Sequence, residues 1–376
     1  MRPLWALLRG AVWIGFLLVC VAHIPAPASA QPGRPSAAQT RLTLQLQWVT
    51  QSQFAGYYAA VEQGFYRDEG LEVTIKVGAV EIVPQQVVAA GGADFGIAWL
   101  PKVLASREQG ASLVNIAQVF QRSGTLEIAW KEAGITKPED WRGKKVGTWG
   151  FGNEPELFAA MRKAGIDPND PRQVTIVQQP FDMALFLNRQ VDAAQAMIYN
   201  EYAQVLEAVN PKTGQLYQPE DLHVIDFNAI GTAMLQDGIF VREDWLANAG
   251  HQETAAKFLR ASFKGWIFCR DQAEACVNLV LKNGPTLGRG HMTWMLNEIN
   301  ALIWPSPVGI GIMDSTAFEQ TARIAQQYQI IKNKPAPGTY RTDLAQKALD
   351  ALARQGLDTQ GLTFQKRRVL VTRGGE

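Results

Sequence analysis

Hydrophobic and polar positions alternate over residues 42–48, and this period of two predicts a β-strand. The pattern then changes. Over residues 54–61 the large apolar side chains recur at helical spacing, and Gly64 can end that helix in a left-handed conformation. Thr50 and Gln53 have the spacing of a capping box. The chain therefore begins with a strand, a short loop and a helix.

The alternation of strand and helix continues along the chain. Pro84 and Pro101 fit the first turn of two further helices. A second series begins near residue 127, where Asn153 or Glu154 can cap one helix and Asn200 another. The predicted strands after the first are 72–77, 95–99, 113–120, 144–149, 174–179 and 193–199. This order is typical of parallel sheets covered by helices on both faces.

The two series share a weak internal repeat. Residues 70–96 and 165–194 each contain a strand, a helix and then an aspartate before a second strand. Two lobes built on one plan explain this repeat. A strand at 238–242 is expected to cross back to the first lobe. The rest of the chain predicts helices at 253–268, 271–281, 291–303, 315–329 and 341–354, with Trp294, Leu296, Ile299 and Ile303 in a core.

The N-terminus has the three parts of a secretory signal peptide. Arg2 and Arg9 precede an apolar run over residues 11–24, and a small-residue cleavage site ends at Ala30. We predict a signal peptide over 1–30 and a disordered leader over 31–40. Because the apolar run is short for a membrane span, the mature protein is expected to be free in the periplasm. A lipid anchor on Cys20 is the alternative, but Val19 stands where such a signal needs a small residue.

Composition excludes several classes of function. The 376 residues suffice for two domains with cores of their own. A net charge of +1 gives no electrostatic case for nucleic acid. After the signal peptide the histidines are His223, His251 and His291, and no two have metal-ligand spacing. Neither a metal site nor a cofactor is therefore predicted.

Two cysteines remain after the signal peptide, Cys269 and Cys276. In one continuous helix they would rise about 10.5 Å apart, which is too far for a disulfide. Asp271 could cap a second helix and place a bend between them. Export favours oxidation. The sequence therefore leaves two alternatives for these cysteines, a disulfide bond or two buried thiols.

Polar and aromatic residues follow the predicted strands of both lobes. In open α/β sheets, ligands bind at the carboxyl ends of the strands. The residues at these ends include no cluster of Arg or Lys, which anionic ligands usually need. A flat ligand with a few polar groups suits such a set. The candidate ligand-binding residues are Trp48, Gln51, Phe54, Trp99, Gln121, Trp149, Asn153, Glu154, Tyr199, Asn200 and Glu201.

The chain resembles the NMT1/THI5-like substrate-binding proteins. The resemblance begins in the segment LQWVTQSQFAGYYAAVEQGFYRDEGLEVTI and continues through GGADFGIAW and WRGKKVG to about Gln329. It implies an α/β, two-lobe periplasmic binding protein fold of type II, each lobe a mostly parallel sheet flanked by helices. We expect lobe 1 at 41–126 and 233–355, lobe 2 at 127–232, and a tail at 356–376. It also implies a monomer that passes a small-molecule ligand to ABC permease and ATPase subunits.

The resemblance also suggests the ligand. In pyrimidine-binding members a segment similar to Tyr199-Asn200-Glu201 supplies a carboxylate to the ligand, so a thiamine pyrimidine precursor is expected. Glu201 could instead be a first-turn glutamate favoured by the helix dipole. Bacterial pyrimidine binders often carry a histidine where this chain has Phe54, which would widen an apolar wall. Riboflavin or an alkanesulfonate such as taurine is therefore the alternative.

An enzyme is the less favoured hypothesis. The fungal pyrimidine synthases of this family carry a lysine and a histidine after the third strand, and a later run of cysteines. Here the matching stretch over residues 97–101 reads IAWLP, and residues 228–238 contain no cysteine. With an export signal present, these differences favour a binding protein without catalytic residues.

Overall fold

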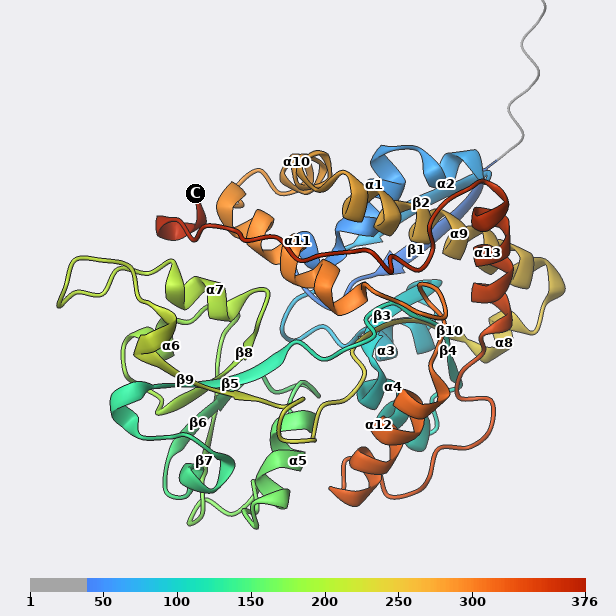
Figure 1. The fold of residues 1–376 in the computed structure, drawn as a ribbon. Coiled ribbons are helices and arrows are strands. Elements are labelled where there is room, and N and C mark those ends of the chain that lie inside the picture. Colours follow the sequence, from blue (N-terminus) through green and yellow to red (C-terminus); the bar gives the residue numbers. More distant parts are fainter. Residues whose placement is uncertain (1–38) are drawn as a thin grey trace, which may run out of the picture. The chain divides into compact units, whose positions relative to one another are not determined.

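Figure 1 shows the computed structural model, which describes residues 39–376. The predicted signal peptide, and the leader up to residue 38, lie outside the described residues. The described chain contains two five-stranded sheets with helices around them. The predicted α/β class is therefore confirmed. The lobe boundaries stay a prediction, and below "lobe 1" and "lobe 2" mean the first and second sheets with their adjoining elements.

The first sheet has the strand order β2-β1-β3-β10-β4. β1 pairs in parallel with β2 and β3, whereas β10 runs antiparallel between β3 and β4. The predicted return strand is confirmed, and it makes the sheet mixed rather than parallel throughout. The strands are β1 (Thr40–Gln45), β2 (Leu71–Lys76), β3 (Phe95–Trp99), β4 (Leu113–Gln118) and β10 (Asp237–Arg242).

The second sheet has the order β7-β6-β8-β5-β9, with β5 as its antiparallel strand. The sequence pattern missed β5 and β9. β5 alternates in sequence (TLEIAW), although it is buried at all six positions, and β9 follows a turn-rich segment. The strands are β5 (Thr125–Trp130), β6 (Lys145–Thr148), β7 (Thr175–Gln178), β8 (Ala193–Met197) and β9 (Leu222–Asp226).

The internal repeat corresponds to a shared structural unit. In lobe 1 the Asp94 carboxylate accepts a hydrogen bond from the Thr43 backbone N–H at 2.7 Å, just before β3. In lobe 2 the Asp192 carboxylate accepts one from the Lys145 backbone N–H, also at 2.7 Å, just before β8. Each aspartate thereby ties the central strand to the first strand of its series. The two sheets are built on one plan, as the repeat predicts.

The helices follow the predicted order, and α2 and α8 are additional. Gly64, Gly91, Gly110 and Gly165 follow helices with positive φ, as expected for C-terminal glycines. The helices are α1 (Ala55–Glu62), α2 (Phe65–Asp68), α3 (Pro84–Ala89), α4 (Leu100–Glu108), α5 (Pro155–Lys163), α6 (Ala184–Leu187), α7 (Glu201–Leu206), α8 (Glu243–Leu246), α9 (Ala249–Asp271), α10 (Ala273–Asn283), α11 (Arg289–Ile303), α12 (Ser315–Gln327) and α13 (Asp343–Arg354).

The predicted side-chain caps are wrong. The Thr50 hydroxyl bonds with the Tyr58 hydroxyl at 2.8 Å, and the Gln53 amide donates to a buried carboxylate, so they form no capping box. Glu154 and Asn200 occupy the N-cap positions of α5 and α7, but neither side chain bonds to a backbone N–H of its helix. The Thr50, Gln53 and Asn200 side chains bond to other polar side chains instead.

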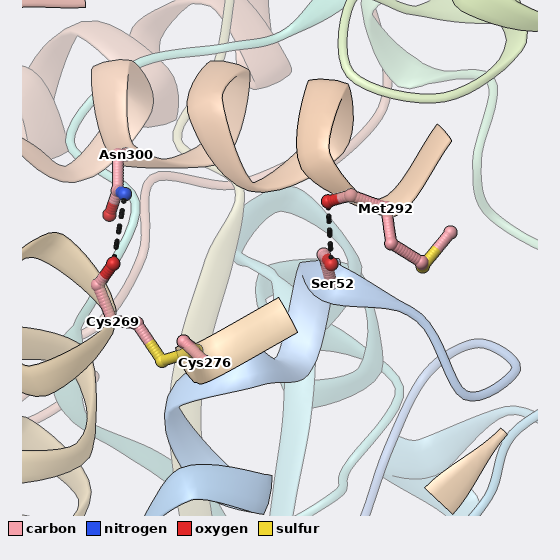
Figure 2. The surroundings of a disulfide bond; sticks show 5 residues. All are labelled: Ser52, Cys269, Cys276, Met292 and Asn300. Atoms are coloured by element: carbon pink, nitrogen blue, oxygen red, sulfur yellow. Dashed lines mark hydrogen bonds between the residues drawn. A yellow bond between two sulfur atoms is a disulfide. The ribbon is translucent and has the colours of Figure 1, made fainter. Parts of the chain in front are cut away.

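The disulfide links the end of α9 to α10. The structure joins Cys269 to Cys276 with their Cα atoms 5.0 Å apart (Figure 2). The two helices are separated at Gln272, which has non-helical φ and ψ values. The bend therefore exists, although Gln272 rather than Asp271 lies at the N-cap. Asn300 of α11 donates to the Cys269 carbonyl at 3.4 Å, so the linked turn packs on α11.

Helix α11 and the tail contact both lobes. Leu296, Ile299 and Ile303 lie in the core as predicted, whereas Trp294 is half-buried and its indole N–H donates to the Ile198 carbonyl of lobe 2. The basic run at 366–368 is not wholly solvated, because Lys366 Nζ donates to buried Glu298 of α11 at 2.6 Å. Within residues 39–376, no helix is both long and apolar enough to cross a bilayer.

Candidate functional site

A small pocket lies where strand ends of the two sheets face each other. Its lining combines aromatic rings, amides and one carboxyl group. Lobe 1 contributes the loop after β1 and the end of β3, and lobe 2 contributes the loops after β6 and β8. The lining residues are Gln47, Trp48, Gln51, Gln53, Trp99, Trp149, Asn153, Met197, Tyr199, Asn200 and Glu201.

Most of the candidate residues line this pocket, and three do not. Phe54 is completely buried in the lobe 1 core, so it cannot widen the wall of the pocket. Gln121 donates to the Gln118 carbonyl at 2.6 Å and is held away from the pocket. Glu154 begins α5 beside the pocket-lining Asn153 but is not part of the lining. The candidates that line it are Trp48, Gln51, Trp99, Trp149, Asn153, Tyr199, Asn200 and Glu201.

Aromatic rings from the two lobes meet across the pocket. Trp48 and Trp149 pack edge to face, with ring centroids 6.2 Å apart. Trp99 and Tyr199 are also almost completely buried. Such rings offer flat apolar faces to a ligand, and their edges carry polar groups that can orient it.

Glu201 begins α7 and is buried. Its Oε2 accepts a hydrogen bond from the Met197 backbone N–H at 2.9 Å, and its Oε1 accepts one from Asn200 Nδ2 at 2.8 Å. Burial raises the pKa of Glu201 to about 7, although these donors oppose the shift. The carboxyl group is therefore held in place by its own lobe, and each oxygen keeps a further lone pair.

Asp237 lies beneath the pocket on lobe 1. Gln47 Nε2 donates to its Oδ1 at 2.5 Å, and Gln53 Nε2 donates to its Oδ2 at 2.9 Å. Burial raises the pKa of Asp237 to about 7, opposed by these donors and by Trp99 and Lys102. Asp237 opens β10 and pairs with Trp99, the last residue of β3. Because β10 is antiparallel, its first residue lies at the carboxyl edge of the other strands.

Lys102 is a buried cation next to the site. It stands in the first turn of α4, is buried, and donates from Nζ to Asn153 Oδ1 of lobe 2 at 3.0 Å. Burial lowers the pKa of Lys102 to about 8, while Glu154 and Asp237 oppose the shift. The ammonium group lies 5.8 Å from the Trp99 ring centroid. It is one buried cation paired within the protein, not a cationic cluster.

A second polar chain joins the lobes beside the pocket. His291 of α11 contacts Glu207 Oε1 through Nδ1 at 2.8 Å and Asn200 Oδ1 through Nε2 at 2.9 Å. Asn200 in turn donates to Glu201. A histidine from lobe 1 therefore holds pocket residues of lobe 2 in place.

Sequence reasoning missed Gln47, Gln53 and Met197 in the lining, and Asp237 and Lys102 below it. Gln47 is one of the polar positions of the strand predicted over residues 42–48, which in fact ends at Gln45. Asp237 lies at the amino end of β10, whereas the rule for open α/β sheets points to carboxyl ends. An aspartate at the start of an apolar strand is the signal that could have revealed this site.

The sequence also matches a known family. The sequence model of the protein family described as "NMT1/THI5 like" matches residues 51–275, which is more than half of the chain. The chain belongs to the NMT1/THI5-like family.

Its relatives include both binding proteins and synthases. A formylaminopyrimidine-binding protein of Halalkalibacterium halodurans is 25% identical over 63% of this chain and 69% of the relative. The riboflavin-binding protein RibY of Chloroflexus aurantiacus is 28% identical over 85% of this chain and 92% of the relative. A 4-amino-5-hydroxymethyl-2-methylpyrimidine phosphate synthase of Legionella pneumophila is 29% identical over only 38% of this chain and 45% of the relative.

Solved structures show the same fold. The alkanesulfonate-binding protein SsuA of Xanthomonas axonopodis, bound to MOPS, has a TM-score of 0.58 and 14% identity, covering 81% of this chain and 99% of its own. The periplasmic aliphatic sulphonate binding protein SsuA of Escherichia coli has a TM-score of 0.53 and 15% identity, covering 88% of this chain and 92% of its own. The periplasmic binding protein fold is therefore confirmed, and such a distant likeness says nothing of the ligand.

Proposed function

We propose that this protein is a periplasmic solute-binding protein of an ABC importer and that it binds a flat nitrogen heterocycle, namely a thiamine pyrimidine precursor. The observation that carries the proposal is the composition of the pocket between the lobes. Its lining offers three tryptophans, a tyrosine, several amides and one carboxyl group. Flat heterocycles gain contact area from such rings and orientation from a few polar groups.

The pocket does not suit an alkanesulfonate. Among the described residues that line it there is neither Arg nor Lys, and Lys102 next to it is paired with Asn153 and lies near Asp237. A sulfonate would also place a negative charge near two buried carboxyl groups, Asp237 and Glu201. A neutral ligand avoids this repulsion.

Riboflavin is the second candidate. The relative RibY shares 92% of its length with this chain, and an isoalloxazine ring also suits aromatic faces. The pocket encloses only about 20 Å³ of free space. The lobes must therefore open less for a single-ring pyrimidine than for a three-ring flavin with its ribityl chain.

The enzyme alternative has less support. Residues 97–101, which match the segment after the third strand in the synthases, hold neither lysine nor histidine. Lys102 follows them, and its Nζ donates to Asn153. A permease and an ATPase are the partners that this proposal requires.

Calorimetric titration of the purified mature protein tests the proposal. We expect saturable binding of formylaminopyrimidine, weaker binding of riboflavin, and none of an alkanesulfonate such as taurine. Chromatography of the bound ligand should recover it unchanged after prolonged incubation. Tight binding of the sulfonate alone would refute the heterocycle proposal, and catalytic conversion of the pyrimidine would refute the binding role.

A further inference from the structure

Three buried polar atoms in the pocket lining have no hydrogen-bond partner among residues 39–376. They are the acceptor Gln47 Oε1 and the donor Trp99 Nε1 of lobe 1, and the donor Trp149 Nε1 of lobe 2. All three side chains are at least nine-tenths buried. Buried polar groups are normally paired, because leaving one unpaired costs about 1–3 kcal/mol. An unpaired acceptor and unpaired donors in one pocket point to a ligand that satisfies them.

The orientation of the Gln47 amide is fixed by its neighbour. Its Nε2 donates to Asp237 Oδ1 at 2.5 Å, and an ionised carboxylate can only accept. The amide nitrogen therefore faces Asp237, and Oε1 is left as the free group. Gln53 also donates to Asp237 but has no free group, because its Oε1 accepts from Gln51 Nε2 at 2.8 Å. Of these two amides, only Gln47 has an oxygen without a hydrogen-bond donor, so only its oxygen is free to accept a hydrogen bond from a ligand.

The indole of Trp149 supplies the complementary donor. Its ring packs on Trp48, so its orientation is set by an aromatic contact between the lobes. Trp99 Nε1 belongs to the same lobe as Gln47, and its indole lowers the pKa of Asp237. Among the described lining residues, Trp149 Nε1–H is the unpaired donor of lobe 2.

We infer that the ligand donates a hydrogen bond to Gln47 Oε1 and accepts one from Trp149 Nε1–H, so that Gln47 and Trp149 determine specificity. The inference rests on the proposed function and adds how the heterocycle is recognised. An aminopyrimidine meets the requirement, since its exocyclic amine donates and its ring nitrogens accept. An amine-free sulfonate carries acceptors only and would leave Gln47 Oε1 unpaired.

The test compares two probes that differ in one group. These are 4-amino-5-hydroxymethyl-2-methylpyrimidine and its deamino counterpart, 5-hydroxymethyl-2-methylpyrimidine, titrated at pH 8, where Asp237 is mostly ionised. The wild-type protein should prefer the amino probe by about tenfold or more, because the deamino probe leaves Gln47 Oε1 unpaired. Gln47→Leu should bind both probes with nearly equal affinity.

Gln53→Leu is the matched control, since it also removes one donor to Asp237 but no free acceptor. The Gln53→Leu variant should keep the preference for the amino probe even if its affinity for both probes is lower than that of the wild-type protein. Trp149→Phe should weaken both probes about equally, because each retains the ring nitrogens. Thermal melts establish that each variant is folded.

The outcomes separate the two claims. An unchanged preference in folded Gln47→Leu would overturn the inference and leave the proposed function standing. Failure of the wild-type protein to bind either probe would overturn the proposed aminopyrimidine ligand and the inference with it. If Gln53→Leu lost the preference for the amino probe to the same extent as Gln47→Leu, then Asp237, not Gln47, would be the group that recognises the amine.

Discussion

At the scale of single residues, fully buried carboxyl groups make the stability of this protein depend on pH. Burial raises the pKa of Glu156, Glu201 and Asp237 to about 7, and that of Glu127 well above 4.5. In the unfolded chain these groups ionise near pH 4. Between about pH 4 and pH 7 the unfolded state therefore binds fewer protons, and the free energy of unfolding falls as pH rises.

Glu127 gives the clearest test of this effect. Both of its carboxyl oxygens are buried without a hydrogen-bond partner among the described residues. Glu127→Gln removes a group that must stay protonated in the fold, so it should raise the melting temperature at pH 8 by roughly 2–4 °C or more. At pH 4.5 the gain should be smaller, because Glu127 is then protonated in about half of the unfolded chains as well.

Glu156→Gln is the matched comparison. Glu156 accepts hydrogen bonds from Ser123 Oγ and the Met234 backbone N–H. An amide would lose one acceptor there, so we expect no gain at pH 8. Equal melting temperatures of Glu127→Gln and wild type at pH 8 would contradict the account of Glu127.

Glu201→Gln distinguishes the two interpretations of that residue. If the carboxyl group contacts the ligand, replacing an acceptor oxygen with a donor should weaken formylaminopyrimidine binding about tenfold or more, since a hydrogen bond to a charged group contributes about 1.5–3 kcal/mol. Titration calorimetry measures this directly. An unchanged affinity would leave Glu201 as a residue that only positions Asn200 and the start of α7.

At the scale of elements, the pocket depends on how α1 packs on α9. A Cβ atom at Gly265 would overlap the Gly56 carbonyl oxygen, and one at Gly56 would overlap the Trp266 ring. The helices can approach this closely because both residues lack a side chain. The loop before α1 contains pocket residues, so this contact positions part of the site.

Gly265→Ala should therefore destabilise the protein by about 2 kcal/mol or more, because the new methyl group meets backbone rather than a flexible side chain. Urea unfolding measures the loss. Gly250→Ala, in the first turn of the same helix, is the control, since its Cβ would meet only Asn248 Oδ1 at 3.1 Å. A similar, small effect of both substitutions would show that the α1–α9 contact is not tightly packed.

The disulfide between α9 and α10 closes a short loop. The sequence separation of Cys269 and Cys276 is seven residues. Chain-entropy estimates for such a loop give about 2–3 kcal/mol of stability. We expect reductant to lower the urea midpoint of the wild-type protein and to leave that of the Cys269→Ser, Cys276→Ser double variant unchanged. If reductant affects both proteins equally, its effect does not come from this bond.

At the scale of the whole molecule, the chain crosses between the sheets at residues 119–124 and 227–236, and polar and aromatic contacts join the lobes at the pocket. Such an arrangement suits hinge closure on a ligand. His291 is the side chain that links α11 to Glu207 and Asn200.

Small-angle scattering should show a smaller radius of gyration with saturating formylaminopyrimidine than without it, because the ligand binds the closed state better. His291→Ala removes the contacts of α11 with Glu207 and Asn200 and should lower ligand affinity, with the ligand-bound radius unchanged. Identical scattering profiles with and without ligand, at concentrations where calorimetry shows binding, would exclude closure.

Much of the fold and part of the site could be predicted from local pattern. Terminal glycines, helix-opening prolines and the apolar run of β3 are local signals, and they placed most elements within a few residues. Trp48, Trp99 and Trp149 were predicted as site residues because the carboxyl ends of parallel strands share an edge. The sequence of β5 (TLEIAW) also alternates, but its burial on both faces is decided by the tertiary structure.

By itself the sequence determined the α/β class, the two similar series, the return strand and the family, because each depends on residues close together in the chain. Only the tertiary structure decided that Asp237 lies beneath the pocket, because its place depends on β10 running antiparallel beside β3. It also decided that Phe54 is in the core and that Lys102 pairs across the lobes. The direction of a side chain at a strand end depends on what packs against it, and those neighbours are distant in sequence.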